Sequence, residues 1–569
     1  MRMNRWSEKK TYKRVSIMSN AEAAAPREVE IPDIPLGRLM EDAAAKYPGR
    51  TAMIFLNKKF SYSQVDRQIR QFMNILRSMG VNKGDVVALM SPNCPQAIIA
   101  FQAVMRIGAI LTQLNPLYVE REVEHQLKDS GAKVAVVANL MAPVFSRAME
   151  RTGVEKTIIF KMQDYMAWPI NWLAPLKWRF AEKRDLTLPA GPKFFMWDQL
   201  MRGASDIAQD AQVAPEDVAL YQYTGGTTGT SKGVILTHRN LVANATQAKA
   251  WIAVAKEGED TMILALPIFH VFGLTAGMNL GFILAMTLVV IPKFEAAEVM
   301  GLIQKHKASF FPGVPLMYQK INENPDTSKY DISSIKFCLS GAAALPRATK
   351  EKFEQLTGGK LVEAYGLTEA SPGTHCNPIL SEGKTGSIGL PLPSTASRIV
   401  DLETGQDAKT GQMGELYVRG PQVMRGYKGA PQETSAVLND GWLRTGDMGY
   451  VDEDGFVFLM DRKKEMILAH GGYNVYPKEL EEVLRELEGV ADVAIVGEPH
   501  PEKGEQVVAA IVRKEGSHLT AEEVIEYSRK NMAAYKMPRR VEFFETLPRT
   551  IIGKVLKREI KNLLRERAV

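Results

Sequence analysis

The sequence predicts an α/β fold with a large N-terminal domain and a small α+β C-terminal domain. At 569 residues the chain is too long for one hydrophobic core, so two or more domains are expected. The composition, with 45% hydrophobic and 24% charged residues, is typical of a globular protein. Helical patterns alternate with short apolar runs through the first half of the chain, and this pattern changes after Asp461.

The first half of the large domain is expected to form layered α/β subdomains. Between about Pro32 and Pro292, helical patterns alternate with apolar runs such as Val86–Met90, Val134–Val137 and Leu288–Ile291. Short apolar runs between helices are typical of buried strands in largely parallel sheets. The sequence therefore predicts stacked α/β layers in this region.

A β-rich subdomain is expected to follow. Gly414–Val423 and Phe456–Met460 are short runs with strand character, and a turn signal, Asp454-Gly455, precedes the second run. Short strands separated by tight turns favour antiparallel pairing. This subdomain completes the predicted large domain.

The C-terminal part has its own pattern of a compact α+β unit. Pro477 stands at the first position of a helix with one apolar face, which Gly489 is expected to end. The apolar positions of that face lie at i, i+3, i+4 and i+7; they are Leu480, Val483, Leu484 and Leu487. Strands at Met466–Leu468, Val493–Val496 and Val507–Val512 and a helix near Glu522–Met532 complete the unit.

These patterns divide the chain into an N-terminal arm at 1–32, a large domain at 33–461 and a small domain at 462–569. The arm begins MRMNRWSEKK, which is basic and lacks the apolar segment of a secretory signal. The three cysteines are far apart and have no CxxC spacing, so neither a disulfide framework nor a zinc site is expected. Both observations favour a cytoplasmic location.

The charge balance does not indicate a nucleic-acid partner. The chain has 71 basic and 65 acidic residues, and a net charge of +6 is small for its length. One uncharged run, Val271–Pro292, is long enough to cross a bilayer. It contains several glycines, and its end is mostly β-branched and closed by Pro292. We expect a buried helix followed by a buried strand rather than a membrane span.

The strongest chemical signal is Tyr223–Gly233, with the sequence YTGGTTGTSKG. Glycines let backbone N–H groups turn toward an anion, while hydroxyls and Lys232 can complete its coordination. The loop is neither a Walker loop, because no glycine directly precedes Lys232, nor the Rossmann fingerprint. Alone, it predicts an anion-binding turn.

Further motifs stand in order behind this loop. They are LPIFHVFG (Leu266–Gly273), SGAAALP (Ser340–Pro346), EAYGLTE (Glu363–Glu369), GWLRTGD (Gly441–Asp447), DRKKEMI (Asp461–Ile467), GGYNVYPKELE (Gly471–Glu481) and LPRTIIGKVLKR (Leu547–Arg558). Together with the glycine-rich loop, this set resembles the adenylate-forming enzymes, which include acyl-CoA synthetases, adenylation domains of peptide synthetases and luciferases. The resemblance covers about residue 33 to the C-terminus and implies ATP, Mg²⁺ and CoA as reactants or cofactors.

The resemblance assigns expected roles to individual residues. Lys554, His270, Lys232 and Glu369 are the expected catalytic residues, and Glu369 and Thr228 the expected Mg²⁺ ligands. The expected ATP- and AMP-binding residues are Thr224, Gly225, Gly226, Thr227, Thr228, Gly229, Lys232, Gly341, Ala342, Ala343, Glu363, Ala364, Tyr365, Gly366, Leu367, Thr368, Asp447, Leu459, Arg462 and Lys554.

Each role has a chemical reason beside the resemblance. A glutamate such as Glu369 supplies the hard oxygen that Mg²⁺ prefers. Tyr365 offers an aromatic face to adenine, and Asp447 can accept both hydrogen bonds of a ribose diol. Lys554 can offset the charge that builds up between the acid and the α-phosphate, whereas His270 is expected to position the acid rather than to act as a general base.

The resemblance also implies that the C-terminal domain is mobile and turns about a hinge at Lys464. Lys554 would serve the first half-reaction, in which the acid forms an acyl-adenylate. A different face of the same domain would then serve the transfer to CoA. The residues expected at CoA are Lys464, Gly471, Gly472, Tyr473 and Lys536.

The acid is specified less closely than the chemistry. The form TGGTTG together with SGAAALP and GWLRTGDMGY is most similar to bacterial long-chain fatty acid–CoA ligases. A ligase for medium-chain or aromatic acids, and an acyl-AMP ligase that loads a carrier protein, remain alternatives. The glycines and alanines after His270 could leave space for an alkyl chain or could only allow close helix packing.

Two further partners stay open at this stage, a second copy of the chain as a homodimer and the inner surface of the cell membrane. Tyr165–Arg184 has three tryptophans, Phe180 and four basic residues within twenty positions. Aromatic and basic residues interleaved in this way suit a membrane interface. The alternative is a surface loop that packs its aromatic side chains onto the domain.

Overall fold

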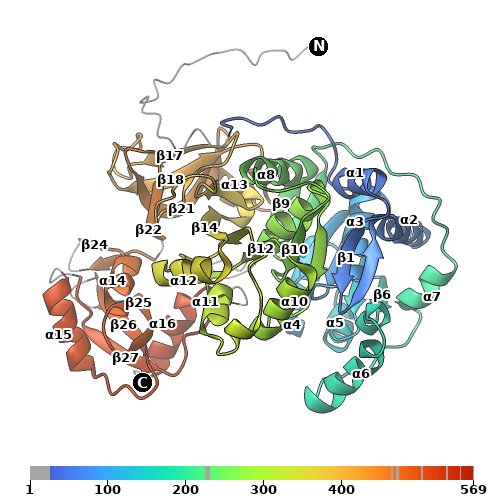
Figure 1. Ribbon diagram of the computed structural model, residues 1–569. Helices are drawn as coiled ribbons and strands as arrows, with labels where there is room; N and C mark the ends of the chain where they lie inside the picture. Colours follow the sequence, from blue (N-terminus) through green and yellow to red (C-terminus); the bar gives the residue numbers. More distant parts are fainter. Residues whose placement is uncertain are drawn as a thin grey trace, which may run out of the picture.

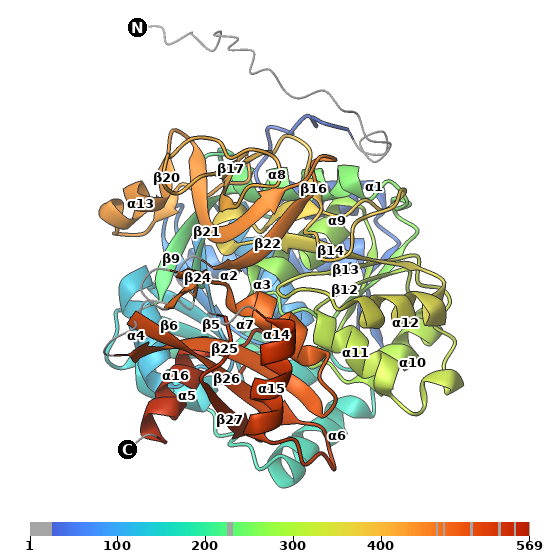
Figure 2. The ribbon, with the colours of Figure 1, turned by 90° about the vertical axis from the view of Figure 1, so that its left-hand side faces the viewer.

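A computed structural model describes residues 26–224, 231–462, 465–469, 473–500, 504–532, 536–550 and 553–567 (Figure 1). It confirms the predicted α/β class, with a large N-terminal domain followed by a small C-terminal domain. The small domain lies against one side of the large one and in front of its sheets in the view of Figure 2.

One sheet of the large domain has the strand order β16-β15-β14-β13-β12-β10-β11-β1-β2. The bounds are β1 Thr51–Phe55, β2 Lys58–Ser61, β10 Thr261–Leu264, β11 Thr287–Val290, β12 Phe310–Gly313, β13 Phe337–Ser340, β14 Lys360–Gly366, β15 Gly373–Cys376 and β16 Leu390–Pro391. The strands from β14 to β1 are parallel, and those at both edges are antiparallel. Parallel central strands and antiparallel edges are common in large α/β sheets.

A second sheet has the order β19-β9-β8-β4-β3-β5-β6-β7. The bounds are β3 Val86–Met90, β4 Ile110–Leu114, β5 Val134–Ala138, β6 Lys156–Phe160, β7 Phe194–Met196, β8 Val218–Thr224, β9 Lys232–Thr237 and β19 Gly426–Tyr427. Its strands are parallel from β8 to β7, while β9 runs antiparallel to both of its neighbours. The short strand β19 thereby brings a segment from far along the chain to the glycine-rich loop.

The predicted β-rich subdomain is an antiparallel sheet of order β17-β18-β21-β20, with β22 also paired to β21. Its strands are β17 Ala396–Val400, β18 Gly414–Arg419, β20 Leu438–Asn439, β21 Trp442–Val451 and β22 Val457–Arg462. The C-terminal sheet has the order β24-β23-β26-β25, with β27 beside β26. Its strands are β23 Ile467–Ala469, β24 Tyr473–Val475, β25 Val490–His500, β26 Gly504–Arg513 and β27 Arg540–Phe544. The chain therefore changes sheets between Arg462 and Ile467.

Helices cover these sheets. Their bounds are α1 Arg38–Lys46, α2 Tyr62–Ser78, α3 Pro95–Arg106, α4 Glu120–Ser130, α5 Ala142–Met149, α6 Ile170–Leu176, α7 Trp197–Arg202, α8 His238–Trp251, α9 Leu280–Ile283, α10 Ala296–His306, α11 Pro315–Glu323, α12 Arg347–Thr357, α13 Pro431–Val437, α14 Pro477–Arg485, α15 Ala521–Asn531 and α16 Lys557–Glu566. Short helical turns are η2 Met162–Tyr165, η3 Lys177–Ala181, η4 Gly273–Asn279, η5 Thr327–Lys329 and η6 Thr368–Ala370, of which η3 and η4 are π-helical.

The burial pattern shows how the layers are built. One continuous core joins the two large sheets through helices α2, α3 and α8 and the turn η4. A second core lies between the other face of the first sheet and α10, α11 and α12. In the C-terminal domain, α14 and α15 pack on one face of the sheet and α16 on the other. Each layer thus buries the apolar face that its period predicts.

Most differences from the predicted elements are shifts of a few residues at their ends. The C-terminal helix α14 begins at Pro477, as predicted, but ends at Arg485, and Gly489 with φ +94° lies in the following turn. The uncharged run Val271–Pro292 forms η4, α9 and the buried strand β11. Within the described residues, no helix has both the length and the apolar character needed to cross a membrane.

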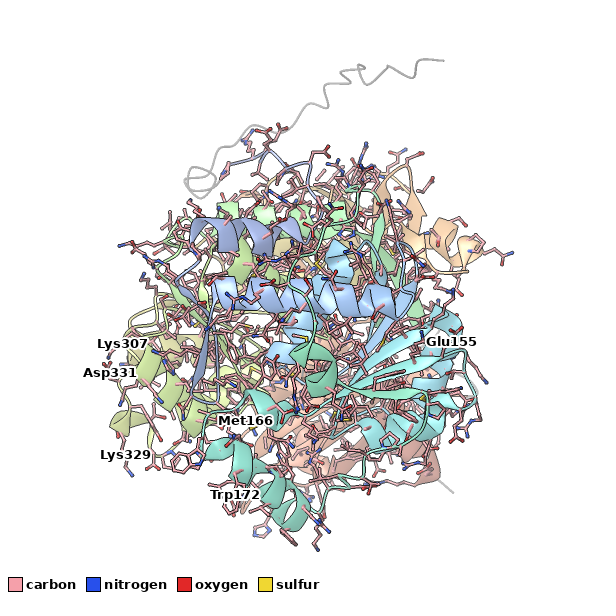
Figure 3. All side chains as sticks on the ribbon, turned by 90° about the vertical axis from the view of Figure 1, so that its right-hand side faces the viewer. Glu155, Met166, Trp172, Lys307, Lys329 and Asp331 are labelled. Atoms are coloured by element: carbon pink, nitrogen blue, oxygen red, sulfur yellow. The ribbon has the colours of Figure 1, made fainter. Side chains whose placement is uncertain are left out.

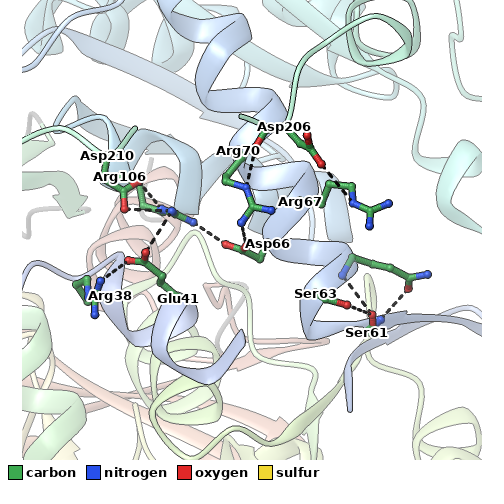
Figure 4. A network of polar contacts seen from close by, with 11 residues as sticks. Arg38, Glu41, Ser61, Ser63, Asp66, Arg67, Arg70, Arg106, Asp206 and Asp210 are labelled. Atoms are coloured by element: carbon green, nitrogen blue, oxygen red, sulfur yellow. Dashed lines mark hydrogen bonds and ion pairs between the residues drawn. The ribbon is translucent and has the colours of Figure 1, made fainter. Parts of the chain in front are cut away.

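A buried cation anchors the segment that leads into β8. Arg106, at the end of α3, has a side chain only 5% exposed and forms hydrogen bonds of 2.7 Å to both Asp66 and Asp210 (Figure 4). Glu41 of α1 lies 3.6 Å from the same guanidinium. A buried charge needs such partners because its desolvation is costly. Asp210 precedes β8 in the chain, so this network fixes the approach to the glycine-rich loop.

Candidate active site

The glycine-rich loop connects two paired strands at the edge where β8 ends. Thr224 faces Lys232 in the register of β8 and β9, and Tyr223 faces Gly233. The expected nucleotide ligands Gly225, Gly226, Thr227, Thr228 and Gly229 lie outside the described residues. The structure therefore positions both ends of the loop, at the carboxyl end of a parallel strand where α/β proteins bind ligands.

Lys232 and Glu369 are brought together by a residue that the sequence did not single out. Tyr427 of β19 donates its hydroxyl hydrogen bond to Glu369 Oε1 at 2.8 Å. The ammonium of Lys232 lies 5.5 Å from the centre of the same ring and forms an ion pair with Glu433 of α13. Tyr427 thus joins the expected phosphate-binding cation to the expected metal-binding carboxylate.

The ion pair with Glu433 predicts a change in ATP affinity. A phosphate group must compete with this carboxylate for Lys232, and a partly exposed ion pair contributes about 0.2–1 kcal/mol. Glu433→Gln is therefore expected to lower the KM for ATP by a factor of about 1.4 to 5. Initial rates of pyrophosphate release at varied ATP measure this effect, with Gln432→Ala as the neighbouring control. A raised KM in Glu433→Gln would mean instead that Glu433 helps to orient Lys232 toward ATP.

The expected adenine and ribose residues also meet. Tyr365 of β14 donates a hydrogen bond to the carboxylate of Asp447 on β21, and Asp447 is only 5% exposed. Asp447 pairs with Arg462 of β22, whose backbone alone is described, and Leu459 lies on the same strand. An aromatic face and a buried acceptor are therefore adjacent, as a nucleoside requires.

The turn after β13 closes this site from the other side. The Gly341 N–H donates to the carbonyl of Gly313 at 3.2 Å, and Ala342 has a φ of +69°. Ala342 and Ala343 are exposed on this turn. The N–H of Leu345 donates to the Glu363 carboxylate at 3.3 Å. Burial raises the pKa of Glu363 to about 7, against the opposing effects of Lys478 and this N–H. Through its hydrogen bond with Leu345, Glu363 stabilises the turn after β13.

Gly366 ends β14 in a place where only glycine fits. A Cβ there would lie 2.1 Å from the carbonyl oxygen of Pro372. The next residue, Leu367, donates its N–H to that same oxygen at 3.0 Å. This tight return places Thr368 and Glu369 on the turn η6, directly after the end of β14, which contains Ala364 and Tyr365. The local backbone thus presents the metal-binding candidate beside the adenine-binding candidate.

His270 is positioned to donate a hydrogen bond rather than to accept a proton. Its Nδ1 accepts the N–H of Phe272 at 3.2 Å, which assigns the imidazole proton to Nε2. Desolvation by burial lowers the pKa of His270 to about 4, so the ring is neutral at neutral pH. A neutral Nε2–H can orient a carboxylate, and this supports the positioning role.

The segment around His270 contacts both large sheets. Gln222 of β8 donates to the carbonyl of Phe269 at 2.9 Å, which ties the segment to the second sheet. A Cβ on Gly341 would lie 2.9 Å from the ring of Phe272, which shows how closely it approaches the turn after β13. The acid and the nucleotide would therefore be held by adjoining walls.

The glycines of η4 and α9 serve close packing. A Cβ on Gly277 would lie 2.4 Å from Leu264, and one on Gly281 would lie 2.4 Å from Leu288. The space beside them is a narrow apolar seam. It is lined by Ile252, Met262, Ala276, Leu280, Phe310, Phe311, Pro312, Phe337 and Leu339. The sequence left open whether the small residues after His270 make space for an alkyl chain or allow close helix packing. Close packing accounts for Gly277 and Gly281, whereas Ala276 faces the seam.

The C-terminal domain places the turn that carries Lys554 on the same side of the first sheet. Lys554 donates its N–H to the hydroxyl of Thr550 at 3.1 Å, in a tight turn that contains Gly553 at φ +78°. A Cβ on Gly553 would lie 3.9 Å from Leu316 of α11. Because α11 follows the carboxyl end of β12, the turn that carries Lys554 lies next to the edge that carries Gly341.

Comparison with known proteins identifies the family. The model of the AMP-binding enzyme family matches residues 40–428, and that of its C-terminal domain matches residues 479–554. The chain belongs to the AMP-binding enzyme family. It is 43% identical to a long-chain-fatty-acid–CoA ligase of Bacillus subtilis (strain 168) over 94% of this chain and 95% of the relative.

Solved structures of MatB superpose on most of the chain. ATP-bound MatB from Rhodopseudomonas palustris is 27% identical, with a TM-score of 0.82 over 94% of this chain and 99% of that one. The apo form of MatB, at the same identity and coverage, has a TM-score of 0.71. The arrangement described here is therefore closer to the ATP-bound form of that enzyme.

The contacts of α14 define this arrangement of the AMP-binding enzyme further. Lys478, near the start of α14, donates to the carbonyl of Leu459 at 2.7 Å. Its charge also opposes the rise in the Glu363 pKa, so it lies near the turn after β13. The C-terminal domain thus contacts the large domain beside the expected nucleotide site.

The expected CoA residues are described only in part. Lys464, Gly471 and Gly472 lie outside the described residues, and only the backbone of Tyr473 is described, in β24. Lys536 forms an ion pair with Glu479 of α14, within its own domain. A role of these residues at CoA stays a prediction.

Proposed function

We propose that this AMP-binding enzyme is a long-chain fatty acid–CoA ligase that forms AMP. The observation that carries the proposal is the convergence of Lys232, Glu369 and Tyr427 at the glycine-rich loop. Asp447 and Tyr365 are paired at the nucleoside side, and the 43% identical relative named a long-chain-fatty-acid–CoA ligase supports the choice of acid.

The first half-reaction makes a better electrophile of the acid. A carboxylate oxygen attacks the α-phosphorus of ATP, the bond from that phosphorus to the bridging oxygen breaks, and pyrophosphate leaves. The Nε2–H of His270 orients the attacking carboxylate. Lys232 and Lys554 offset the repulsion between the anions, while Tyr365 and Asp447 hold adenine and ribose.

The chemistry of the donor set fits magnesium bound largely by the nucleotide. In the part of the chain that is described, no group of three or more His, Cys, Asp or Glu side chains could hold a metal. Mg²⁺ commonly binds through one or two carboxylates and substrate phosphates, so a lone Glu369 suffices, with Thr228 as the second proposed ligand. When bound, Mg²⁺ would neutralise part of the phosphate charge.

The second half-reaction transfers the acyl group. The thiol of CoA loses its proton, its sulfur attacks the acyl carbon, and the carbon–oxygen bond to AMP breaks. We propose that the domain at 462–569 turns about Lys464 relative to the domain at 33–461 between the two steps. The change of sheets between Arg462 and Ile467 supports a hinge at this place.

We further propose that the enzyme acts in the cytoplasm, where ATP and CoA are supplied. The thiols of Cys94, Cys338 and Cys376 are buried and free, which suits a reducing compartment.

Acid specificity tests the proposed function directly. Pyrophosphate release is measured for saturated acids of increasing length and for benzoate, each with and without CoA. Each buried methylene contributes about 0.8 kcal/mol, so kcat/KM is expected to rise about fourfold per methylene until the space that binds the alkyl chain is filled. A maximum at short or aromatic acids would overturn the long-chain assignment. Acyl transfer to a carrier protein but not to CoA would show that the acceptor is the carrier protein and not CoA.

A further inference from the structure

The helix α6, the turn η3 and the residues just before α6 expose apolar side chains on the surface. Five of them define what we call the outer face, namely Trp168, Trp172, Leu173, Leu176 and Phe180. The three aromatic residues are 84%, 68% and 70% exposed in sequence order. Figure 3 shows Trp172 at the rim of the molecule, on a helix that stands off its body, and α6 has the same outlying position in Figure 1. Contiguous exposed apolar side chains of this kind mark interaction sites.

A second apolar stripe of the same helix faces inward. Ile170, Ala174 and Trp178, at positions i, i+4 and i+8, pack against the main core. Trp172, Leu176 and Phe180 have the same spacing but lie on the outer face. The inward stripe therefore anchors the helix, so packing onto the domain explains Trp178 but does not explain the outer face.

Basic residues accompany the outer face. Lys177, Arg179, Lys183 and Arg184 are all exposed, and Glu182, the acid between them, is paired with Arg184 at 2.8 Å. The acidic groups that face this surface from the neighbouring segment are Glu295 and Glu298, both near Lys177, and Glu295 is itself paired with the exposed Lys293. Asp185, which directly follows Arg184, is a further exposed acid. With Lys293, five basic residues outnumber these four acidic ones around the apolar side chains, which favours an anionic partner.

We infer that the outer face docks on the surface of an anionic membrane, with its aromatic side chains at the level of the lipid headgroups. Tryptophan and phenylalanine beside lysine and arginine are the composition of interfacial helices. Each basic residue near an anionic leaflet strengthens binding about fivefold. A second copy of the chain fits less well, because a stable dimer buries about 800 Å² per partner, more than one short helix offers.

The test uses the full chain and vesicles of phosphatidylcholine, either alone or with one third phosphatidylglycerol. Sedimentation with the anionic vesicles is expected to bind the protein at least tenfold more strongly than with neutral vesicles. The variant Trp168→Ser/Trp172→Ser/Phe180→Ser is expected to lose at least tenfold of that binding. Trp178 is left in place because it packs against the core.

The matched control is Ile207→Ser/Leu380→Ser/Leu402→Ser, which removes three exposed apolar side chains elsewhere on the surface and should bind vesicles like the wild type. The variant Lys183→Glu/Arg184→Glu should weaken binding to anionic vesicles but leave binding to neutral vesicles unchanged. Equal binding of vesicles by the wild type and the outer-face variant would overturn the inference. The inference would also be overturned if the wild type and the control variant formed a dimer and the outer-face variant did not. Vesicle binding is measured without turnover, so its failure is distinct from failure of the proposed function.

Discussion

Lys554→Ala is expected to slow acid-dependent pyrophosphate release about a thousandfold. Loss of one group that stabilises developing charge in a water-poor site commonly costs a factor of about 10²–10³ in rate. The turn that carries Lys554 lies next to Leu316, at the edge of the first sheet that also carries Gly341. The turn therefore lies beside the edge where we propose that the acid meets the α-phosphate.

The second half-reaction separates this role from a general loss of folding. A chemically prepared acyl-adenylate is supplied together with CoA, and thioester formation is measured. We expect Lys554→Ala to retain this activity within about threefold, because the proposed turn of the C-terminal domain moves Lys554 away from the site before this step. Lys561→Ala on α16 is the control, since Lys561 is also a lysine of the C-terminal segment, 3.9 Å from Glu505. An equal loss in both half-reactions would contradict the assigned role of Lys554.

Asp447→Ala is expected to lower kcat/KM for ATP about a hundredfold while changing the KM for the acid little. The carboxylate would accept two hydrogen bonds from the ribose diol, and hydrogen bonds to a charged group contribute about 1.5 kcal/mol or more each. Asp447 is 5% exposed and belongs to the pairing of β21 with β22. Steady-state rates at varied ATP measure the effect, and thermal unfolding checks that the β-rich subdomain remains folded.

Tyr365→Phe is the matched control for Asp447. It removes the hydroxyl that donates to Asp447 but keeps the ring that would stack on adenine. If Asp447 acts on the ribose, this variant should change kcat/KM for ATP by less than about fivefold. Similar losses in Tyr365→Phe and Asp447→Ala would show that the carboxylate works mainly by holding the tyrosine.

Part of the candidate site could be predicted from sequence because three of its motifs lie at the carboxyl ends of strands in the large domain. Tyr223–Gly233 spans the turn from β8 to β9, the turn that begins at Gly341 follows β13, and Tyr365 lies near the end of β14. Parallel strands place their carboxyl ends along one edge, so order in the sequence implies proximity in space. The pairing of Tyr365 with Asp447 does not follow from this rule, because Asp447 lies within β21 of an antiparallel sheet. The resemblance of the motifs, and not their order, grouped these two residues.

Tyr427 and Glu433 could not be predicted in the same way. They reach Lys232 through β19, a strand of two residues that has no detectable period, and through α13, in which no residue is buried. The two stripes of α6, by contrast, had a signal in the sequence. The spacing of Ile170, Ala174 and Trp178 separates the inward tryptophan from those on the outer face.

The contact between Gly341 and Phe272 has a kinetic consequence. The two residues belong to the walls that we propose face the nucleotide and the acid, and they are in direct contact. A displacement of Phe272 by a bulkier acid would be transmitted to the turn proposed to hold adenine, because packed interiors deform little. The affinities for the two substrates are then thermodynamically linked. The factor by which a given acid changes the affinity for ATP equals the factor by which ATP changes the affinity for that acid. Selectivity for the acid is in this sense a property of the ternary complex and not of one pocket.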